Sequence, residues 1–368
     1  MMFLSLCLSL GARAQDTHWS VNIYDYQYDM TAYLALTADG EAVADYSNYE
    51  VAAFCGEACR GVATVQTADG KSYCYLRIRS NQASGETITF KVYVKDIERE
   101  VAVENYSMTF TSQSVQGMPS SPVTLDFTMP VFNLDENSEA FTASGGAAKV
   151  TVMRKITPNN WNTICLPFSM TKTMVETVFG TSAEMAEFAG FETVYDSGNP
   201  NVPYTITLNF STYTLDEEHL LTAGKPFLIK TDKGFDSFEV ENVKVSNSLT
   251  PTVKTDNHGT SGRFVGTFVK TKVPENALFV NGGKLWYSKG ESNVKAFRGW
   301  FELGAVLGQE TNLNARLLIS IDGETTGIDN LERTNDSEDG RIYNLNGQRV
   351  SQAAGGLYIV NGRKMMKQ

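Results

Sequence analysis

The residue types needed for acid–base chemistry gather at one place in the sequence, Asp216-Glu217-Glu218-His219. On a turn, these carboxylates and the imidazole could act as general acid and base or hold a metal ion. A run of this kind is more often a solvated loop, and we interpret it as one, with catalysis as the alternative. The chain contains no G-x-S-x-G, P-loop, G-x-G-x-x-G or H-E-x-x-H motif. The sequence therefore predicts no enzyme, no metal site and no cofactor.

A second group of candidate residues is aromatic and suited to binding. Tyr24, Tyr26 and Tyr28 alternate, so a β-strand would place all three rings on one face. Exposed rings would form a platform on which sugars stack, whereas buried rings would be ordinary packing, which is their commoner role. The same two interpretations apply to Trp286-Tyr287 and to Trp300. These rings are the candidate binding residues.

The cysteines leave three pairings open. One of the five lies in the apolar run at the start of the chain, and the other four are Cys55, Cys59, Cys74 and Cys165. In an oxidising compartment we favour a Cys55–Cys59 disulfide, because a three-residue hairpin loop would set the two opposite each other. Cys165 lies between apolar residues and is predicted to be a buried free thiol. Zinc is the alternative for the cysteines, but no second Cys-x-x-Cys or His pair completes such a site.

The elements that must position these residues are β-strands. The stretch from Ile88 to Val94 alternates apolar and polar residues, as in a strand with one packed face. Thr-Ala-Asp-Gly occurs at 37–40 and 67–70, where Asp-Gly between apolar runs predicts hairpin turns. We expect an all-β chain, with one β-sandwich module over residues 15–128 and a second over residues 129–328.

The only helical signals lie in the second module. Thr173-x-x-Glu176 and Thr181-x-x-Glu184 have the spacing of capping boxes, and Gly180 and Gly190 could end the two helices. The sequence therefore predicts one or two short helices here. In the same module, Asn281-Gly282 predicts a hairpin.

Charge and targeting signals bear on partners and location. The formal net charge is −11 and no cluster of Lys or Arg occurs, which argues against nucleic acid and anionic lipid as partners. Phe3 to Leu10 is apolar and precedes Ala12-Arg13-Ala14, so residues 1–14 are predicted to be a secretory signal peptide. No later run reaches the roughly 18 apolar residues that span a bilayer, so no transmembrane segment is expected.

The C-terminal segment follows the polar, acidic stretch 329–340, which is predicted to be a linker. Residues 341–368 hold two alternating runs with Asn-Gly pairs at 346–347 and 361–362, which predicts a small set of hairpins. This tail resembles the C-terminal sorting region of proteins exported by the type IX secretion system of Gram-negative bacteria. The residues that carry the resemblance include Tyr343, Gly347, Gly356, Tyr358 and Lys364.

The resemblance implies recognition by the type IX machinery and a location outside the outer membrane, secreted or on the cell surface. Cys59-Arg60-Gly61 and Trp161 to Phe168 resemble parts of modules of undefined function in the same class of secreted proteins. We expect an exported, non-catalytic binding or adhesin-like protein that engages a glycan or another extracellular polymer. A structural or assembly component of the cell surface is the alternative. An extracellular hydrolase, resting on the cluster at 216–219 alone, is the third hypothesis.

Overall fold

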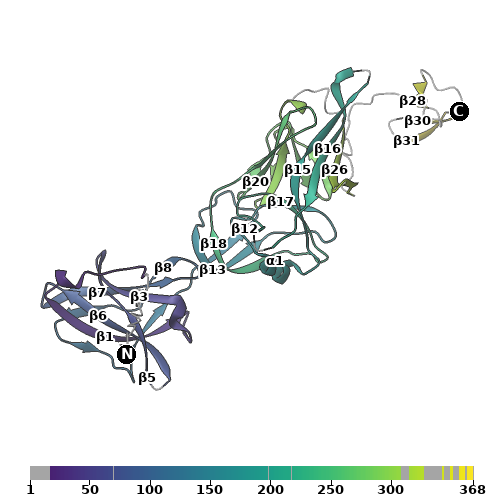
Figure 1. Cartoon of the computed structure of the whole chain (residues 1–368). Helices are drawn as coiled ribbons and strands as arrows, with labels where there is room; N and C mark the ends of the chain where they lie inside the picture. Colours follow the sequence, from purple (N-terminus) through teal and green to yellow (C-terminus); the bar gives the residue numbers. More distant parts are fainter. Residues whose placement is uncertain are drawn as a thin grey trace, which may run out of the picture. The chain divides into compact units, whose positions relative to one another are not determined.

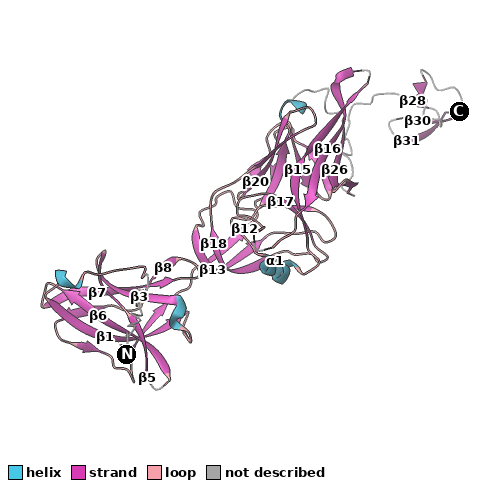
Figure 2. Cartoon of the chain, in the orientation of Figure 1, coloured by secondary structure: helices cyan, strands magenta, loops and turns pink. Residues whose placement is uncertain are grey.

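Figure 1 shows the computed structural model of the chain, which describes residues 17–68, 70–197, 199–216, 218–307 and 315–326 and four short strands between 342 and 367. The predicted signal peptide and the predicted linker lie outside the described residues. Strands make up 55% of the structure and helices 5%, which confirms the all-β class (Figure 2). The chain divides into two compact units, Met1–Asp329 and Asn330–Gln368, which are described separately.

The first module of the larger unit contains two sheets. The first has six strands in the order β10-β1-β6-β5, with β2 and β11 also paired to β1. Its strands are β1 (Tyr28–Ala38), β2 (Glu41–Ala42), β5 (Thr64–Ala68), β6 (Lys71–Ser80), β10 (Val115–Gln116) and β11 (Val123–Phe127). The second has five strands in the order β4-β3-β7-β8, with β9 paired to β7. Its strands are β3 (Tyr49–Cys55), β4 (Ala58–Val62), β7 (Ser84–Val94), β8 (Arg99–Ala102) and β9 (Met108–Thr111).

A single apolar core lies between these sheets. On β7, Phe90, Val92 and Val94 are buried at alternate positions, as the sequence pattern predicts. On β1 the buried alternate residues include Ala32 and Leu34, and they belong to the same core cluster. Burying both inner faces drives the two sheets together, because each square ångström of apolar surface removed from water stabilises the fold by about 25 cal/mol.

The predicted hairpin turns form in this module. Between β1 and β2, Ala38 pairs with Glu41, and the two loop residues Asp39 and Gly40 have φ angles of 53° and 83°. A primed two-residue turn requires such positive φ angles, which Asp and Gly tolerate. Between β5 and β6, Ala68 pairs with Lys71, so this connection also has two residues.

The second module contains three larger sheets and one strand pair. The three-stranded sheet is β12 (Val131–Asp135), β13 (Gly145–Met153) and β18 (Phe238–Val245). The six-stranded sheet, in spatial order, is β14 (Asn162–Ile164), β17 (Phe227–Lys230), β15 (Glu184–Asp196), β16 (Asn199–Thr212), β26 (Arg316–Ile321) and β27 (Glu324–Thr325). The five-stranded sheet is β19 (Thr252–Thr255), β20 (Ser261–Thr267), β25 (Arg298–Glu302), β22 (Ala277–Asn281) and β23 (Lys284–Tyr287). The strand pair is β21 (Thr271–Lys272) and β24 (Asn293–Val294).

At least three apolar clusters hold these sheets among the described residues, where the sequence predicted one sandwich. Between the six- and five-stranded sheets, Phe264 and Phe301 stack with ring centres 4.4 Å apart, and Phe188 lies 5.8 Å from Phe301. A second cluster packs the three-stranded sheet against the module's α-helix, where the rings of Phe179 and Phe238 are 4.9 Å apart. A third contains Val265, Phe279 and Trp300. The second module is therefore built of more layers than its strand pattern alone indicates.

The described residues contain one α-helix, α1 (Lys172–Phe179), which lies beside β13 and β18 in Figure 1. Its N-cap is Thr171 and not the predicted Thr173. The Thr171 hydroxyl accepts a hydrogen bond from the Met174 N–H at 3.3 Å. Gly180 ends the helix as predicted, with its N–H bonded to the Glu176 carbonyl. One helix is within the predicted one or two. The second capping signal, at Thr181–Glu184, does not give a helix, because residues from Glu184 onward pair with β16 and β17.

Strand pairing overrides the local helix signal in that second segment. A capping box contributes about 1 kcal/mol, whereas the strand β15 gains a ladder of backbone hydrogen bonds on both sides. Gly190, the predicted helix end, lies at a β-bulge in β15 with a φ angle of 143°. Glycine tolerates the positive φ angle that this bulge requires, so Gly190 serves the bulge and does not cap a helix.

The smaller unit is a four-stranded antiparallel sheet in the order β29-β28-β30-β31. The strands are β28 (Ile342–Tyr343), β29 (Arg349–Val350), β30 (Gly356–Val360) and β31 (Arg363–Lys367). Val360 pairs with Arg363, so a two-residue loop joins β30 and β31, as predicted at 361–362. Tyr343 pairs with Arg349, which leaves five residues between β28 and β29. The predicted turn at Asn346-Gly347 lies outside the described residues.

Candidate functional site

The three alternating tyrosines do not share a strand face. Asn22 caps a short 3₁₀ helix, Ile23–Asp25, by accepting a hydrogen bond from the Tyr24 N–H at 3.3 Å. The strand β1 begins only at Tyr28, so the alternation that predicted one face is broken. The Tyr24 ring is 89% exposed, and Tyr26 lies 5.1 Å from the Arg60 guanidinium. The predicted single strand face for the three rings is therefore wrong, because a capped 3₁₀ helix precedes β1.

The other candidate rings mostly serve packing. Trp300 is 8% exposed, and its indole N–H donates to Glu302 Oε1 at 2.9 Å. The Tyr287 hydroxyl donates to Asn276 Oδ1, and burial raises the pKa of Tyr287. Trp286 is half-buried and packs against the apolar cluster that contains Trp300 and Phe279. Trp286 and Trp300 thus both pair with Phe279 of β22, and residues 279–281 of that strand line a pocket.

The acidic cluster at 216–219 is a solvated turn. Asp216 Oδ1 accepts hydrogen bonds from the backbone N–H groups of Glu218 and His219 at 2.8 and 2.7 Å, and it lies 2.9 Å from the His219 ring nitrogen. These hydrogen bonds lower the pKa of Asp216. Glu217 lies outside the described residues. Within the described part of the chain, no three His, Cys, Asp or Glu side chains gather as metal ligands, and no helix has the length and apolarity to cross a membrane.

The predicted Cys55–Cys59 disulfide is not formed, and both thiols are free. The loop between β3 and β4 has two residues, so Cys55 pairs with Ala58 while Cys59 pairs with Phe54. Adjacent strand residues point to opposite faces, so the two sulfurs are directed apart. Cys165 is free and fully buried, as predicted.

Thiol labelling tests this cysteine arrangement. We expect native, unreduced protein to be labelled at Cys55 and Cys59, which are partly exposed, and unfolding to add Cys74 and Cys165. Burial raises the pKa of Cys74 to about 12 and also raises the pKa of Cys165, so both remain unreactive thiols in the folded state. Peptide mapping identifies the labelled sites. If Cys55 is not labelled in the unreduced, denatured chain, the two thiols are not free and the Cys55–Cys59 disulfide is present.

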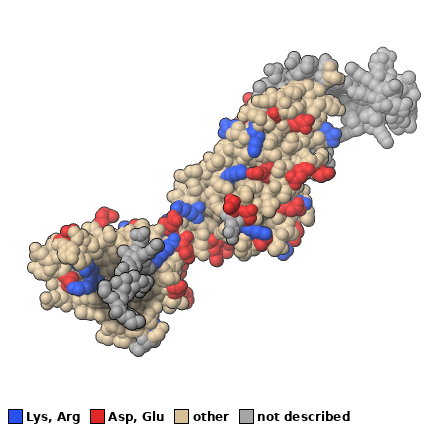
Figure 3. Space-filling view, viewed as in Figure 1, with Lys and Arg blue, Asp and Glu red and all other residues tan. Residues whose placement is uncertain are grey.

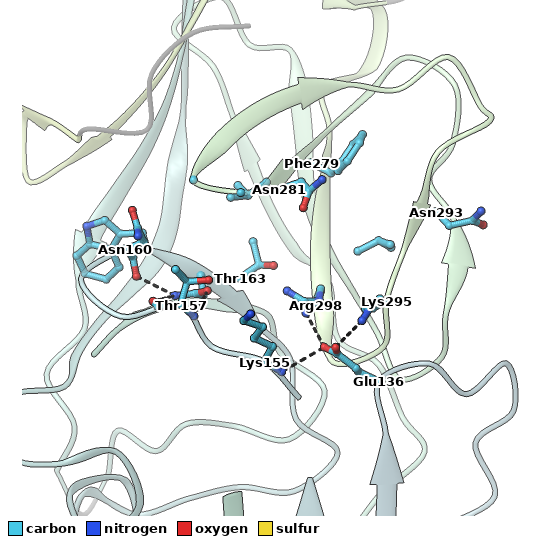
Figure 4. A pocket seen from close by; sticks show the side chains of 16 residues that line it. Glu136, Lys155, Thr157, Asn160, Thr163, Phe279, Asn281, Asn293, Lys295 and Arg298 are labelled. Atoms are coloured by element: carbon cyan, nitrogen blue, oxygen red, sulfur yellow. Dashed lines mark hydrogen bonds and ion pairs between the residues drawn. The ribbon is translucent and has the colours of Figure 1, made fainter. Parts of the chain in front are cut away.

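A pocket with a volume of about 410 Å³ lies in the second module. We call it the Trp161 pocket (Figure 4). Its lining comes from the segments 155–163, 279–283 and 293–298, together with Glu136. Small-molecule sites in proteins typically occupy roughly 300–1,000 Å³, so the pocket has a suitable size.

Local hydrogen bonds fix two rims of the Trp161 pocket. The Asn162 carboxamide bonds the backbone N–H and C=O of Thr157 at 3.1 and 2.9 Å and the Asn160 carbonyl at 2.8 Å, which fastens the loop that carries Trp161. The facing rim is the β22–β23 hairpin, whose turn residues Gly282 and Gly283 have φ angles of 58° and 71°. The predicted hairpin is confirmed, with its turn one residue later than Asn281-Gly282, because Asn281 pairs with Lys284.

The floor of the Trp161 pocket is an ion network centred on Glu136. Glu136 is 6% exposed, and its carboxylate lies 2.6 Å from Lys295 Nζ and 2.5 Å from Arg298 Nη2. It also accepts a hydrogen bond from the Lys155 backbone N–H at 3.3 Å. Burial acts to raise the pKa of Glu136, but its bonds to Lys295 and Arg298 outweigh burial and hold the pKa below its usual value. Figure 4 shows these cations around the Glu136 carboxylate.

A further cation is buried close to this floor. Arg154 is fully buried and donates to the backbone carbonyl of Thr163, a residue that lines the pocket. Among the described residues, its Nε and Nη1 atoms have no hydrogen-bond partner. Burial, followed by the like charge of Arg298, lowers the pKa of Arg154 to about 9, while Glu136 acts in the opposite direction. Arg154 therefore carries a positive charge at neutral pH without a carboxylate bonded to it.

The pocket also offers neutral polar groups and one ring. Among the described residues, no hydrogen bond joins the exposed carboxamides of Asn281 and Asn293 to the rest of the chain. Trp161 is half-buried, and Lys230 Nζ lies 5.8 Å from its ring centre. Free carboxamides can donate to and accept from hydroxyl groups, and an indole can pack against a sugar ring. The arrangement is equipped to bind a polar ligand.

Sequence reasoning missed this pocket because its lining is spread over more than 160 residues, from Glu136 to Arg298. The only local signal was the Pro158-Asn159-Asn160 turn beside Trp161. No protein family, no curated protein and no solved structure matches the chain.

Proposed function

We propose that this protein is an exported, non-catalytic binding protein that holds a saccharide in the Trp161 pocket. The observation that carries the proposal is the joint presence there of a half-buried indole and the unengaged carboxamides of Asn281 and Asn293. Saccharides present apolar ring faces edged by hydroxyl groups, so this pairing of ring and carboxamide matches them.

The number of carboxylates that line the pocket supports binding without catalysis. Glycoside hydrolysis in most enzyme families uses two carboxyl groups on either side of the scissile bond. Glu136 is the one carboxylate among the residues that line the Trp161 pocket, and it is bonded to two cations. Its lowered pKa keeps it ionised, so it is unsuited to donate a proton.

A glycan panel tests the proposal. We expect the purified chain to bind a subset of immobilised polysaccharides, and Trp161→Ala to weaken that binding roughly thirtyfold, about 2 kcal/mol, as for other central aromatic anchors. The matched control is Tyr24→Ala, which removes a ring that is 89% exposed and should leave the affinity unchanged. Equal binding by Trp161→Ala, or loss of binding in Tyr24→Ala, would contradict the assignment to this pocket.

The route of export forms the second part of the proposal. The resemblance of the tail to type IX sorting regions supports outer-membrane passage, and the formation of a separate compact unit by Asn330–Gln368 supports a handle that the larger unit does not need for folding. A small sheet contributes little to another module's core.

Deletion of Asn330–Gln368 tests this role. We expect the thermal midpoint of the remaining chain to shift by less than about 2 °C, while the protein stays in the periplasm of its Gram-negative host. Fractionation and calorimetry of the same variant provide the two measurements. A tailless protein that still reaches the cell surface excludes the sorting role, and aggregation of that protein would show that the tail belongs to the fold of the larger unit.

A further inference from the structure

The Trp161 pocket has an excess of positive charge, although the whole chain has a formal net charge of −11. Three cations line it, Lys155, Lys295 and Arg298, against one carboxylate, Glu136. The local balance is therefore +2 before the buried Arg154 is counted. On the face of the larger unit seen in Figure 3, Lys and Arg side chains are scattered among Asp and Glu. The lining of the pocket differs from that mixed surface.

The single carboxylate is already fully engaged. Its two oxygens bind Lys295 and Arg298 and accept the Lys155 N–H. Lys155 is exposed, and among the described residues no carboxylate pairs with its ammonium group. Two nitrogen atoms of the fully buried Arg154 have no hydrogen-bond partner in the part of the chain that the structure describes. An anion in the pocket would thus meet one free ammonium group at the surface and the field of a buried guanidinium.

Burial strengthens this field. A charge held away from water acts through a lower effective dielectric, so its attraction for an anion is several times larger than in bulk solvent. Arg154 is 0% exposed, and the backbone carbonyl of the lining residue Thr163 is its hydrogen-bond acceptor. Glu136 is the carboxylate whose charge favours the protonated form of Arg154, and it is shared with Lys295 and Arg298. A buried cation this close to a lined cavity favours a ligand that carries negative charge.

We infer that the ligand of the Trp161 pocket is an acidic saccharide, whose carboxylate or sulfate group pairs with Lys155 above the Glu136–Arg298 floor while its ring lies against Trp161. This inference rests on the proposed saccharide-binding function and narrows its ligand class. The carboxamides of Asn281 and Asn293 bind the remaining hydroxyl groups.

Calorimetry on the full chain separates the ligand classes. The probes are an oligogalacturonate, the same oligosaccharide with its carboxyl groups reduced to hydroxymethyl groups, a sulfated galactan oligosaccharide of equal length, and sodium sulfate. We expect at least one acidic oligosaccharide to bind ten times more tightly than the reduced one, and the affinity to fall as sodium chloride is raised. The two acidic probes distinguish a carboxylate from a sulfate as the recognised group.

Variants locate the charge contact. Lys155→Gln should weaken binding of the acidic probe about tenfold or more, because it removes a charge-assisted hydrogen bond, and should leave binding of the reduced probe unchanged. Lys254→Gln is the matched control, since Lys254 is an exposed lysine outside the pocket. Thermal midpoints within about 2 °C of the parent chain establish that both variants are folded.

Each outcome decides between the two proposals. Equal affinity for the acidic and reduced probes overturns the inference and leaves saccharide binding standing. Sodium sulfate that binds as tightly as the acidic oligosaccharides also overturns it, because the pocket would then hold an inorganic anion alone. If Lys155→Gln binds the acidic probe with unchanged affinity, the proposed contact between Lys155 and the acidic group is wrong. Binding of none of these saccharides, together with a negative glycan panel, removes the proposed function itself.

Discussion

Replacing Phe301 with Ala is expected to lower the free energy of unfolding of the second module by about 4 kcal/mol. Phe301 is fully buried where the six- and five-stranded sheets meet. Its ring stacks on Phe264 at 4.4 Å and lies within 5.9 Å of the rings of Phe188 and Phe210. Removing the Phe301 ring leaves a cavity among the three other rings, and this cavity cannot close unless a whole sheet moves. The expected loss of unfolding free energy therefore lies in the upper part of the range for large-to-small core substitutions.

The measurement is thermal unfolding of the full chain, with an expected fall in the midpoint of roughly 10 °C for a module of this size. Phe301→Leu keeps most of the volume and should cost about 1–1.5 kcal/mol. Tyr204→Ala is the surface control, because the Tyr204 ring is 66% exposed, and it should change stability by less than about 0.5 kcal/mol. A midpoint for Phe301→Ala within 2 °C of the parent would contradict the two-sheet packing.

Replacing Glu136 with Gln is expected to destabilise the same module by about 3 kcal/mol at pH 7. The substitution keeps the shape of the side chain but leaves Lys295, Arg298 and the buried Arg154 without their one nearby anion. Removing one partner of a buried ion pair costs about 3–5 kcal/mol, and the partial exposure of Lys295 places the expected value at the lower end. Glu139→Gln is the matched control, because its pair with Lys270 is solvent-exposed and contributes about 0–1 kcal/mol.

The pH dependence of this difference follows from the lowered pKa of Glu136. A carboxyl group whose pKa is lower in the folded state stabilises the fold above its unfolded pKa, which is about 4.3 for Glu. That contribution is lost as the pH falls through the folded pKa. Urea unfolding should therefore show the largest gap between the parent chain and Glu136→Gln at neutral pH, and a shrinking gap below about pH 4. A gap that is constant from pH 7 to pH 3 would exclude this electrostatic origin.

Local sequence patterns determined several features of this protein correctly. The alternation at Ile88–Val94 requires a strand with one buried face, and Asp39-Gly40 supplies the two positive φ angles of a hairpin turn. Cys165 is buried because its neighbours in the chain are apolar. In each case the physical cause acts within a few residues, so the pattern and the structure agree.

Tertiary structure alone decided the features that depend on partners distant in the chain. Thr181–Glu184 carries a helix-capping signal, yet the segment that follows is a strand because β16 and β17 supply hydrogen-bond ladders. Whether Cys55 and Cys59 meet depends on strand register, and a shift of one residue directs their side chains to opposite faces.

The Trp161 pocket shows the same limit most strongly. Its floor joins Glu136 to Lys295 and Arg298, and in the sequence each of these is an ordinary charged residue. The electrostatic character of a site depends on the distances between its charged groups and on their burial. Neither quantity can be predicted from the composition of a single sequence segment. The fold class was therefore available from the sequence, because periodicity is local, whereas the candidate site arose only when the packing of the sheets brought these charges together.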